Sequence, residues 1–147
     1  MQQAAQTPSP DDLERRRRGA EMLAKVDGPA GLAVVDALAR SFPDFAHLLL
    51  EFPFGDIYAR PGLSLQQREL ATVAALCALG NAQPQLRVHV QAALHVGCTA
   101  ASIVEVVMQM AVYAGFPAAL NGLAVVREVF GTAGISLPLT PRCHTAA

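Results

Sequence analysis

The sequence predicts an all-α protein of six or seven helices, and three observations support this fold class. Its 147 residues are 52% hydrophobic, which is enough to build the core of one domain. Alanine and leucine dominate and tryptophan is absent, a composition that favours helix over sheet. Apolar residues recur at helical spacing, and no segment alternates polar and apolar residues between hairpin turns.

The first half of the chain is expected to form three helices. The first runs from about Asp12 to Val26, where Asp27-Gly28-Pro29 stops it, and a short second helix covers about Gly31–Ala39. Ser41 and Pro43 then resemble a helix start. This third helix is expected to run towards residue 57, with the proline at position 53 bending or breaking it.

The second half begins after a predicted turn at residues 60–62. Ser64 and Gln67 have capping-box spacing, so a helix is expected to begin there and to end at Gly80. Three more helices are bounded by glycine, proline or a capping threonine: Pro84 to Gly97, Thr99 to Gly115, and Pro117 to Phe130. The sequence therefore predicts a disordered tail over 1–11, one helical domain over 12–132 and an extended tail over 133–147.

Charge and composition exclude several classes of partner. The net charge of −1 offers no electrostatic basis for nucleic-acid binding. The only basic run, Arg15–Arg18, follows three acidic residues and is interpreted as a solvated helix of mixed charge rather than a polybasic anchor. Apolar stretches are interrupted before they reach membrane length, and no secretory signal is recognisable. Three cysteines without close spacing indicate a reducing, cytoplasmic setting.

The helix predicted from Pro84 carries the strongest candidate for chemistry. Gln85 and His89 are four residues apart and so share a helix face. Ala92 and Ala93 nearby would leave room for a ligand or for close helix packing. A hydrogen-bonded core histidine is the alternative role for His89. No group of residues has the spacing of a metal site.

Four other residues could bind a substrate. Arg60 and Arg68 could each hold a carboxylate, although surface ion pairs are the alternative. Gln109 and Tyr113 share a helix face and would be either buried hydrogen-bonding groups or pocket lining. Cys98 lies in a turn before a helix, but without a second cysteine nearby it is interpreted as structural.

Five segments, in order and spacing, resemble the carboxymuconolactone decarboxylase family of the alkylhydroperoxidase-like superfamily. They are residues 54–63, 68–76, 85–93, 97–109 and 113–119. The resemblance implies an all-α bundle of the alkylhydroperoxidase-like type that assembles into a homo-oligomeric ring, usually a hexamer. It also implies a lyase of aromatic catabolism that decarboxylates 4-carboxymuconolactone with no metal or organic cofactor.

The resemblance further assigns roles at the site. Its matched motif places the face shared by Gln85 and His89 in the family's pocket, so we expect His89 to be the proton donor or the orienting hydrogen-bond donor at the reacting carbon, with Gln85 fixing its ring. We also expect one or both of Arg60 and Arg68 to hold a substrate carboxylate, and Gln109 and Tyr113 are kept as candidate substrate contacts from their spacing. The Cys-x-x-Cys pair of the peroxidase branch is missing, so no peroxidase activity is expected. Gln85 stands where similar decarboxylases carry glutamate. This leaves open a cofactor-free isomerase or cyclase of a biosynthetic pathway, or a member without catalysis.

Overall fold

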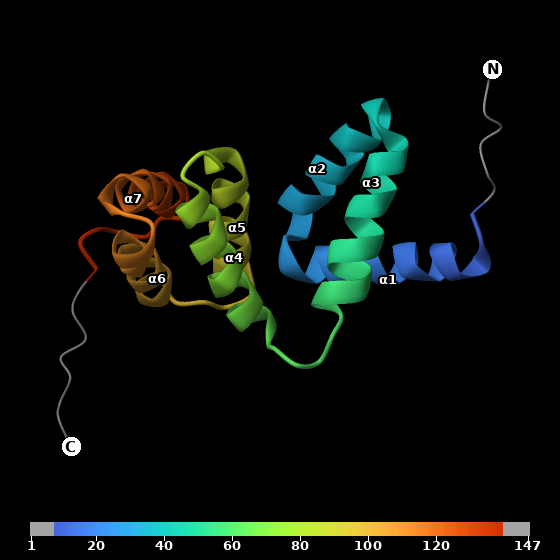
Figure 1. Ribbon diagram of the computed structural model, residues 1–147, viewed down its shortest axis with the longest axis horizontal. Helices are drawn as coiled ribbons and strands as arrows, with labels where there is room; N and C mark the ends of the chain where they lie inside the picture. Colours follow the sequence, from blue (N-terminus) through green and yellow to red (C-terminus); the bar gives the residue numbers. More distant parts are fainter. Residues whose placement is uncertain (1–7, 140–147) are drawn as a thin grey trace. The chain divides into compact units, whose positions relative to one another are not determined.

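The computed structural model describes residues 8–139, and within them all regular secondary structure is helical. Seven α-helices and one π-helix follow one another along this part of the chain, so the all-α prediction is confirmed (Figure 1). The described residues form two compact units, residues 8–65 and residues 66–139. None of the described helices is long and apolar enough to cross a membrane.

The first unit contains three α-helices and the π-helix: α1 (Pro10–Val26), α2 (Gly28–Ser41), α3 (Pro43–Leu49) and η1 (Leu50–Tyr58). The helix α1 starts earlier than predicted because Ser9 and Asp12 form a capping box. The Ser9 hydroxyl accepts from the Asp12 amide at 3.2 Å, and the Asp12 carboxylate accepts from the Ser9 amide at 3.1 Å. Residues 10 and 11, which were expected to belong to the N-terminal tail, are therefore helical, whereas residues 1–7 of that predicted tail lie outside the described residues.

Three expectations for this unit are corrected. The helix α2 begins directly at Gly28, whose φ of 57° lets the chain turn without a linker. Ser41 is the last residue of α2, and Phe42 takes the N-cap position of α3 with no side-chain cap bond. Pro53 does not end the helix, because the chain continues through it as the nine-residue π-helix η1.

Backbone contact joins α1 to η1. A Cβ atom added at Gly19 would lie 2.1 Å from the Leu50 carbonyl oxygen, and one added at Gly55 would lie 2.8 Å from the Arg15 carbonyl oxygen. Only glycine at these two positions allows the helices to approach this closely. The pair makes the most extensive contact between elements of the first unit.

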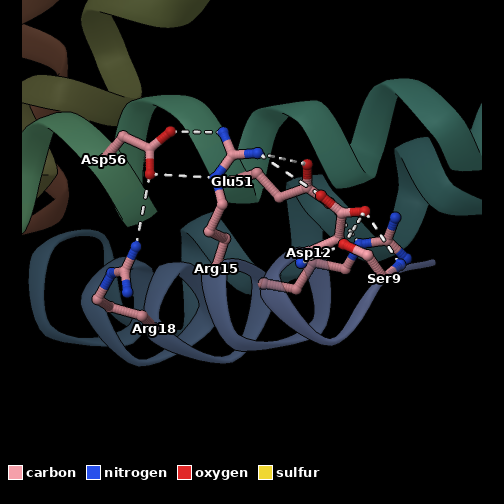
Figure 2. A network of polar contacts seen from close by, with 7 residues as sticks. Ser9, Asp12, Arg15, Arg18, Glu51 and Asp56 are labelled. Atoms are coloured by element: carbon pink, nitrogen blue, oxygen red, sulfur yellow. Dashed lines mark hydrogen bonds and ion pairs between the residues drawn. The ribbon is translucent and has the colours of Figure 1, made fainter.

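The arginine run on α1 also contacts η1, as Figure 2 shows for Arg15 and Arg18. Arg16 pairs with Glu51 of η1 as well, whereas Arg17 pairs with Glu14 and Glu21 of its own helix. The run is thus part of a helix of mixed charge, as predicted. However, three of its four side chains form hydrogen bonds or ion pairs with η1 and are not simply solvated.

The second unit consists of α4 (Leu65–Leu79), α5 (Gln83–His95), α6 (Ala100–Tyr113) and α7 (Phe116–Thr132). Gly80, Gly97 and Gly115 follow the first three of these helices with φ values of 74°, 93° and 86°, which confirms the predicted stops. The predicted cap of α6 is also confirmed, since the Thr99 hydroxyl accepts from the Ser102 amide at 3.0 Å.

Side chains from all four helices build the core of the second unit. Its largest fully buried members are Phe130, Ile103, Val73, Val90 and Val107. Cys77 belongs to this core, as predicted, and its Sγ would lie 2.6 Å from a Cβ added at Gly122. The helices α4 and α7 therefore pack closely at a glycine.

Candidate active site

A buried carboxylate and a histidine meet between two helices of the second unit. Glu69 comes from the first half of α4 and His89 from the middle of α5, and Glu69 Oε2 lies 3.0 Å from His89 Nδ1. The Glu69 side chain is fully buried, whereas the His89 side chain is 21% exposed. Solvent therefore does not reach the Glu69 side chain, whereas a small molecule can reach part of the His89 ring.

The geometry of this pair suits proton transfer. A carboxylate at Nδ1 accepts the N–H of that nitrogen and so fixes the tautomer and the orientation of the ring. The other ring nitrogen, Nε2, then becomes the atom that exchanges a proton with a bound molecule. A histidine held in this way can act as a general acid, and a carboxylate is the usual group that holds it.

Glu69 is a candidate site residue that the sequence analysis does not identify. The helical spacing did contain a signal, because Glu69, Val73 and Cys77 follow one another at four-residue intervals and form the buried stripe of α4. An acidic residue on such a stripe needs a buried partner, and the helix α5 supplies one.

Gln85 lies one turn before His89 on α5, as the spacing predicted, and it is exposed. The carboxylate beside His89 therefore comes from α4 rather than from the position of Gln85. An orienting role for Gln85 stays a prediction.

The two candidate arginines belong to different units. Arg68 is half-buried in the first turn of α4, directly before Glu69. Arg60 is exposed in the first unit, two residues after η1, and its amide donates to the Ile57 carbonyl at 3.2 Å. A role for either guanidinium in binding a carboxylate stays a prediction.

Gln109 and Tyr113 lie on α6 and are both exposed, with Tyr113 exposed to 77%. Within residues 8–139, neither side chain makes a hydrogen bond. A role as buried hydrogen-bonding groups is therefore wrong for both, and contact with substrate stays a prediction.

Cys98 packs close to the catalytic candidates without the features of a reactive thiol. It is buried, and its Sγ donates to the Gln66 carbonyl at 3.6 Å. Burial, and secondarily the negative charge of Glu69, raise the pKa of the Cys98 thiol, so it stays protonated at neutral pH. Cys77 and Cys98 are both free thiols, and Cys143 lies outside the described residues.

The sequence model of the carboxymuconolactone decarboxylase family matches residues 43–128, more than half of the chain. The chain belongs to this family. A 4-carboxymuconolactone decarboxylase of Acinetobacter baylyi is 32% identical over 127 residues, covering 86% of this chain and 94% of that protein. The resemblance inferred from the five sequence segments is therefore confirmed.

Two further relatives extend the comparison. The nitrosuccinic acid decarboxylase of Metarhizium robertsii is 29% identical over 121 residues, covering 80% of this chain and 84% of that protein. An uncharacterised 15.0 kDa protein of Paracoccus denitrificans is 35% identical over 95 residues, 64% of this chain and 71% of that protein. The carboxymuconolactone decarboxylase family and its two named decarboxylases support a decarboxylase-type function for this member.

Proposed function

We propose that the protein is a cofactor-free decarboxylase whose substrate carries a carboxylate next to a group that can accept an electron pair. The single observation that carries this proposal is the contact between the buried Glu69 and the partly exposed His89. The decarboxylase names of two relatives support the reaction class. A 4-carboxymuconolactone-like lactone or a related enolisable ring is the substrate class that we propose.

The relatives' substrates share the chemistry that makes a cofactor unnecessary. In 4-carboxymuconolactone the lactone carbonyl can accept the electron pair that the departing carbon dioxide leaves behind, which gives an enolate-type anion. In nitrosuccinic acid the nitro group beside a carboxylate can do the same and give a nitronate. The substrate itself is then the electron sink, and the protein has to position it, desolvate the carboxylate and deliver a proton.

Each step can be assigned to a side chain of this chain. The C–C bond to the carboxylate breaks and its electron pair enters the conjugated system. For this step His89 has to carry a proton on both ring nitrogens: it gives the Nε2 proton to the carbanion carbon and is left neutral with its remaining proton on Nδ1, held by Glu69. Nε2 then regains a proton from solvent. Arg68 would hold a second carboxylate of the substrate as a bidentate fork, the role that the sequence also predicts for Arg60. Gln85, Gln109 and Tyr113 would line the approach to His89.

We further propose that the protein works as a homo-oligomer, most simply a hexamer. Large apolar side chains are exposed along α6 and the start of α7: Met108, Val112, Tyr113, Phe116 and Leu120. An apolar face of this kind on a soluble protein is normally covered by a partner surface. A second copy would bury this face, and light scattering that found a stable monomer at micromolar concentration would refute the assembly.

The reaction class can be tested on the purified full-length protein. It is incubated separately with 4-carboxymuconolactone and with nitrosuccinate, while released carbon dioxide is measured and the product mass is determined. We expect carbon dioxide and a product lighter by its mass with at least one of the two. A product of unchanged mass would instead indicate an isomerase or cyclase, and no turnover of either would support a non-catalytic family member.

A further inference from the structure

A side chain at the start of α4 is hydrogen-bonded to the end of α5. Gln66 is the second residue of α4, and its Nε2 donates to the Val96 carbonyl at 2.6 Å. Val96 is the C-cap of α5, where a helix leaves carbonyl groups that it cannot use itself. The Gln66 amide thus caps a helix to which it does not belong.

Gln66 also receives a contact from the turn that follows α5. Cys98 Sγ donates to the Gln66 carbonyl at 3.6 Å, so the side chain and the main chain of Gln66 both bond to this turn. The Gln66 amide lies beside Gly97, because a Cβ atom added there would be 3.7 Å from Nε2. One bond given and one received therefore join the start of α4 to the turn between α5 and α6.

This attachment lies one helical turn from the Glu69–His89 pair. Gln66 is three residues before Glu69, so the two share a side of α4 and are about 4.5 Å apart along its axis. On α5 the order is reversed, because His89 comes before Val96. The two links thus come in opposite order along α4 and α5, as they do between antiparallel helices.

Side chains rather than backbone packing hold α4 beside α5 at this point. The two helices make hardly any close backbone contact. Glu69 follows directly after the first turn of α4, and the end turns of a helix fray most easily. Without the bond from Gln66 to Val96, the start of α4 would be free to move away from α5 and to take Glu69 with it.

We propose that Gln66 is a positioning residue: its bond to Val96 holds Glu69 where this carboxylate fixes the Nδ1–H tautomer of His89. The effect on catalysis rests on the proposed function, in which His89 delivers a proton from Nε2. The effect on the pair rests only on contacts within the second unit.

The test compares two glutamine-to-methionine variants of the full chain. Gln66→Met removes the N–H donor and keeps an unbranched, flexible side chain. Gln83→Met is the matched control, because the Gln83 amide also donates to a main-chain carbonyl, that of Gly80 at 2.9 Å. This second bond spans only three residues of the turn between α4 and α5, so its loss should leave Glu69 in place.

The first readout does not depend on activity. Nitrogen NMR of protein with isotope-labelled histidine, recorded where the imidazole is neutral, reports which ring nitrogen carries the proton, and His89→Ala assigns the signals of His89. We expect the Nδ1–H form in the wild type and in Gln83→Met. Gln66→Met should show a mixture with the Nε2–H form, because Glu69 then no longer stays at Nδ1.

The second readout is steady-state kinetics on the substrate that the wild type decarboxylates. The kcat of Gln66→Met should fall about tenfold with KM within a few-fold, because proton delivery loses its fixed geometry while no contact with the substrate is removed. Gln83→Met should keep the wild-type kcat and KM.

The outcomes separate the positioning role from the proposed function. Unchanged ring signals in Gln66→Met would overturn the positioning of Glu69, whatever the activity. Equal changes in Gln83→Met would also overturn it, since the loss of any amide bond would then have the same effect. Changed signals with a wild-type kcat would show that the bond has no part in the reaction. A wild-type protein that turns over neither substrate would refute the proposed function, while the ring signals would still decide whether Gln66 holds the pair.

Discussion

Glu69 and His89 are twenty residues apart in the chain, yet the carboxylate oxygen Oε2 of Glu69 lies 3.0 Å from Nδ1 of His89. Glu69 is fully buried, so it cannot exchange this partner for water. A buried carboxylate is costly unless it is paired, so the fold of the second unit has to provide Glu69 with a partner, and His89 is one. Such an arrangement is typical of a functional site.

Glu69→Gln should therefore lower kcat by about 10²-fold, because an amide can present either its oxygen or its nitrogen to His89 and no longer fixes one tautomer. Steady-state kinetics on the substrate that the wild type decarboxylates measure this loss. Glu128→Gln is the control: Glu128 is an exposed glutamate of α7 that pairs with Arg87 at 2.7 Å. A Glu69→Gln variant as active as Glu128→Gln would remove Glu69 from the mechanism.

The surroundings of this pair could be predicted from the sequence only in part. Glycine and threonine signals at Gly80, Gly97 and Thr99 located the helix ends of the second unit, because these signals act through local backbone geometry. The position of His89 on a helix could be predicted for the same reason. The pairing with Glu69 could not, because it depends on how α4 and α5 pack rather than on spacing along either helix.

In the first unit, too, the sequence predicts features that depend on neighbouring residues and does not predict features that depend on contacts between distant residues. Proline at position 53 predicted a bend or a break, since an α-helix loses a hydrogen bond there. The π-helix η1 forms instead, and it does so where Gly19 and the arginines of α1 contact it. These contacts join residues more than thirty positions apart, and no local pattern reports them.

Cys98→Ser should leave turnover within a few-fold of the wild type. The thiol is buried, its pKa is raised and it donates to the Gln66 carbonyl, a contact that a serine hydroxyl can reproduce. Decarboxylase kinetics and a peroxide-consumption assay should be run on both proteins, and neither protein should consume peroxide. Complete loss of turnover in Cys98→Ser would show that a single catalytic thiol has been overlooked.

Gly19→Ala should reduce the free energy of unfolding by about 1–3 kcal/mol, because its Cβ would lie 2.1 Å from the Leu50 carbonyl oxygen and the backbone would have to shift. Gly131→Ala is the matched control within α7, where an added Cβ meets nothing within 4 Å. It should gain about 0.5–1 kcal/mol from helix propensity. Urea unfolding of both variants measures the two changes, and equal stability would mean that α1 and η1 do not touch in solution.

Acid should destabilise the protein through Asp56. Its hydrogen bond with Arg15 is the largest cause that holds the pKa of the Asp56 carboxyl below the ordinary 3.8, and the charges of Arg15 and Arg18 add to it. A carboxyl with a depressed folded-state pKa stabilises the fold above its unfolded-state pKa, and this contribution is lost as the pH falls through the folded-state value. The stabilisation is thus complete at pH 7 and declines below about pH 4.

Thermal midpoints between pH 7 and pH 3 check this dependence. Asp56→Asn should have a lower midpoint than the wild type at pH 7, and the two should converge towards pH 3. Asp36→Asn, at an exposed position of α2, should follow the wild type throughout. Curves for Asp56→Asn and wild type that stay parallel down to pH 3 would contradict a stabilising role for the Asp56 carboxylate.

The central claim, that His89 delivers the proton, is tested most directly by the kcat of His89→Ala on the substrate that the wild type decarboxylates. The account predicts a fall of about 10²–10⁴-fold in a variant that circular dichroism and melting show to be folded. His95→Ala, at the exposed end of the same helix, should keep wild-type turnover. The opposite pattern would contradict proton delivery by His89: a loss of about 1–3 kcal/mol of stability from the lost contact with Glu69, with wild-type turnover in the molecules that remain folded.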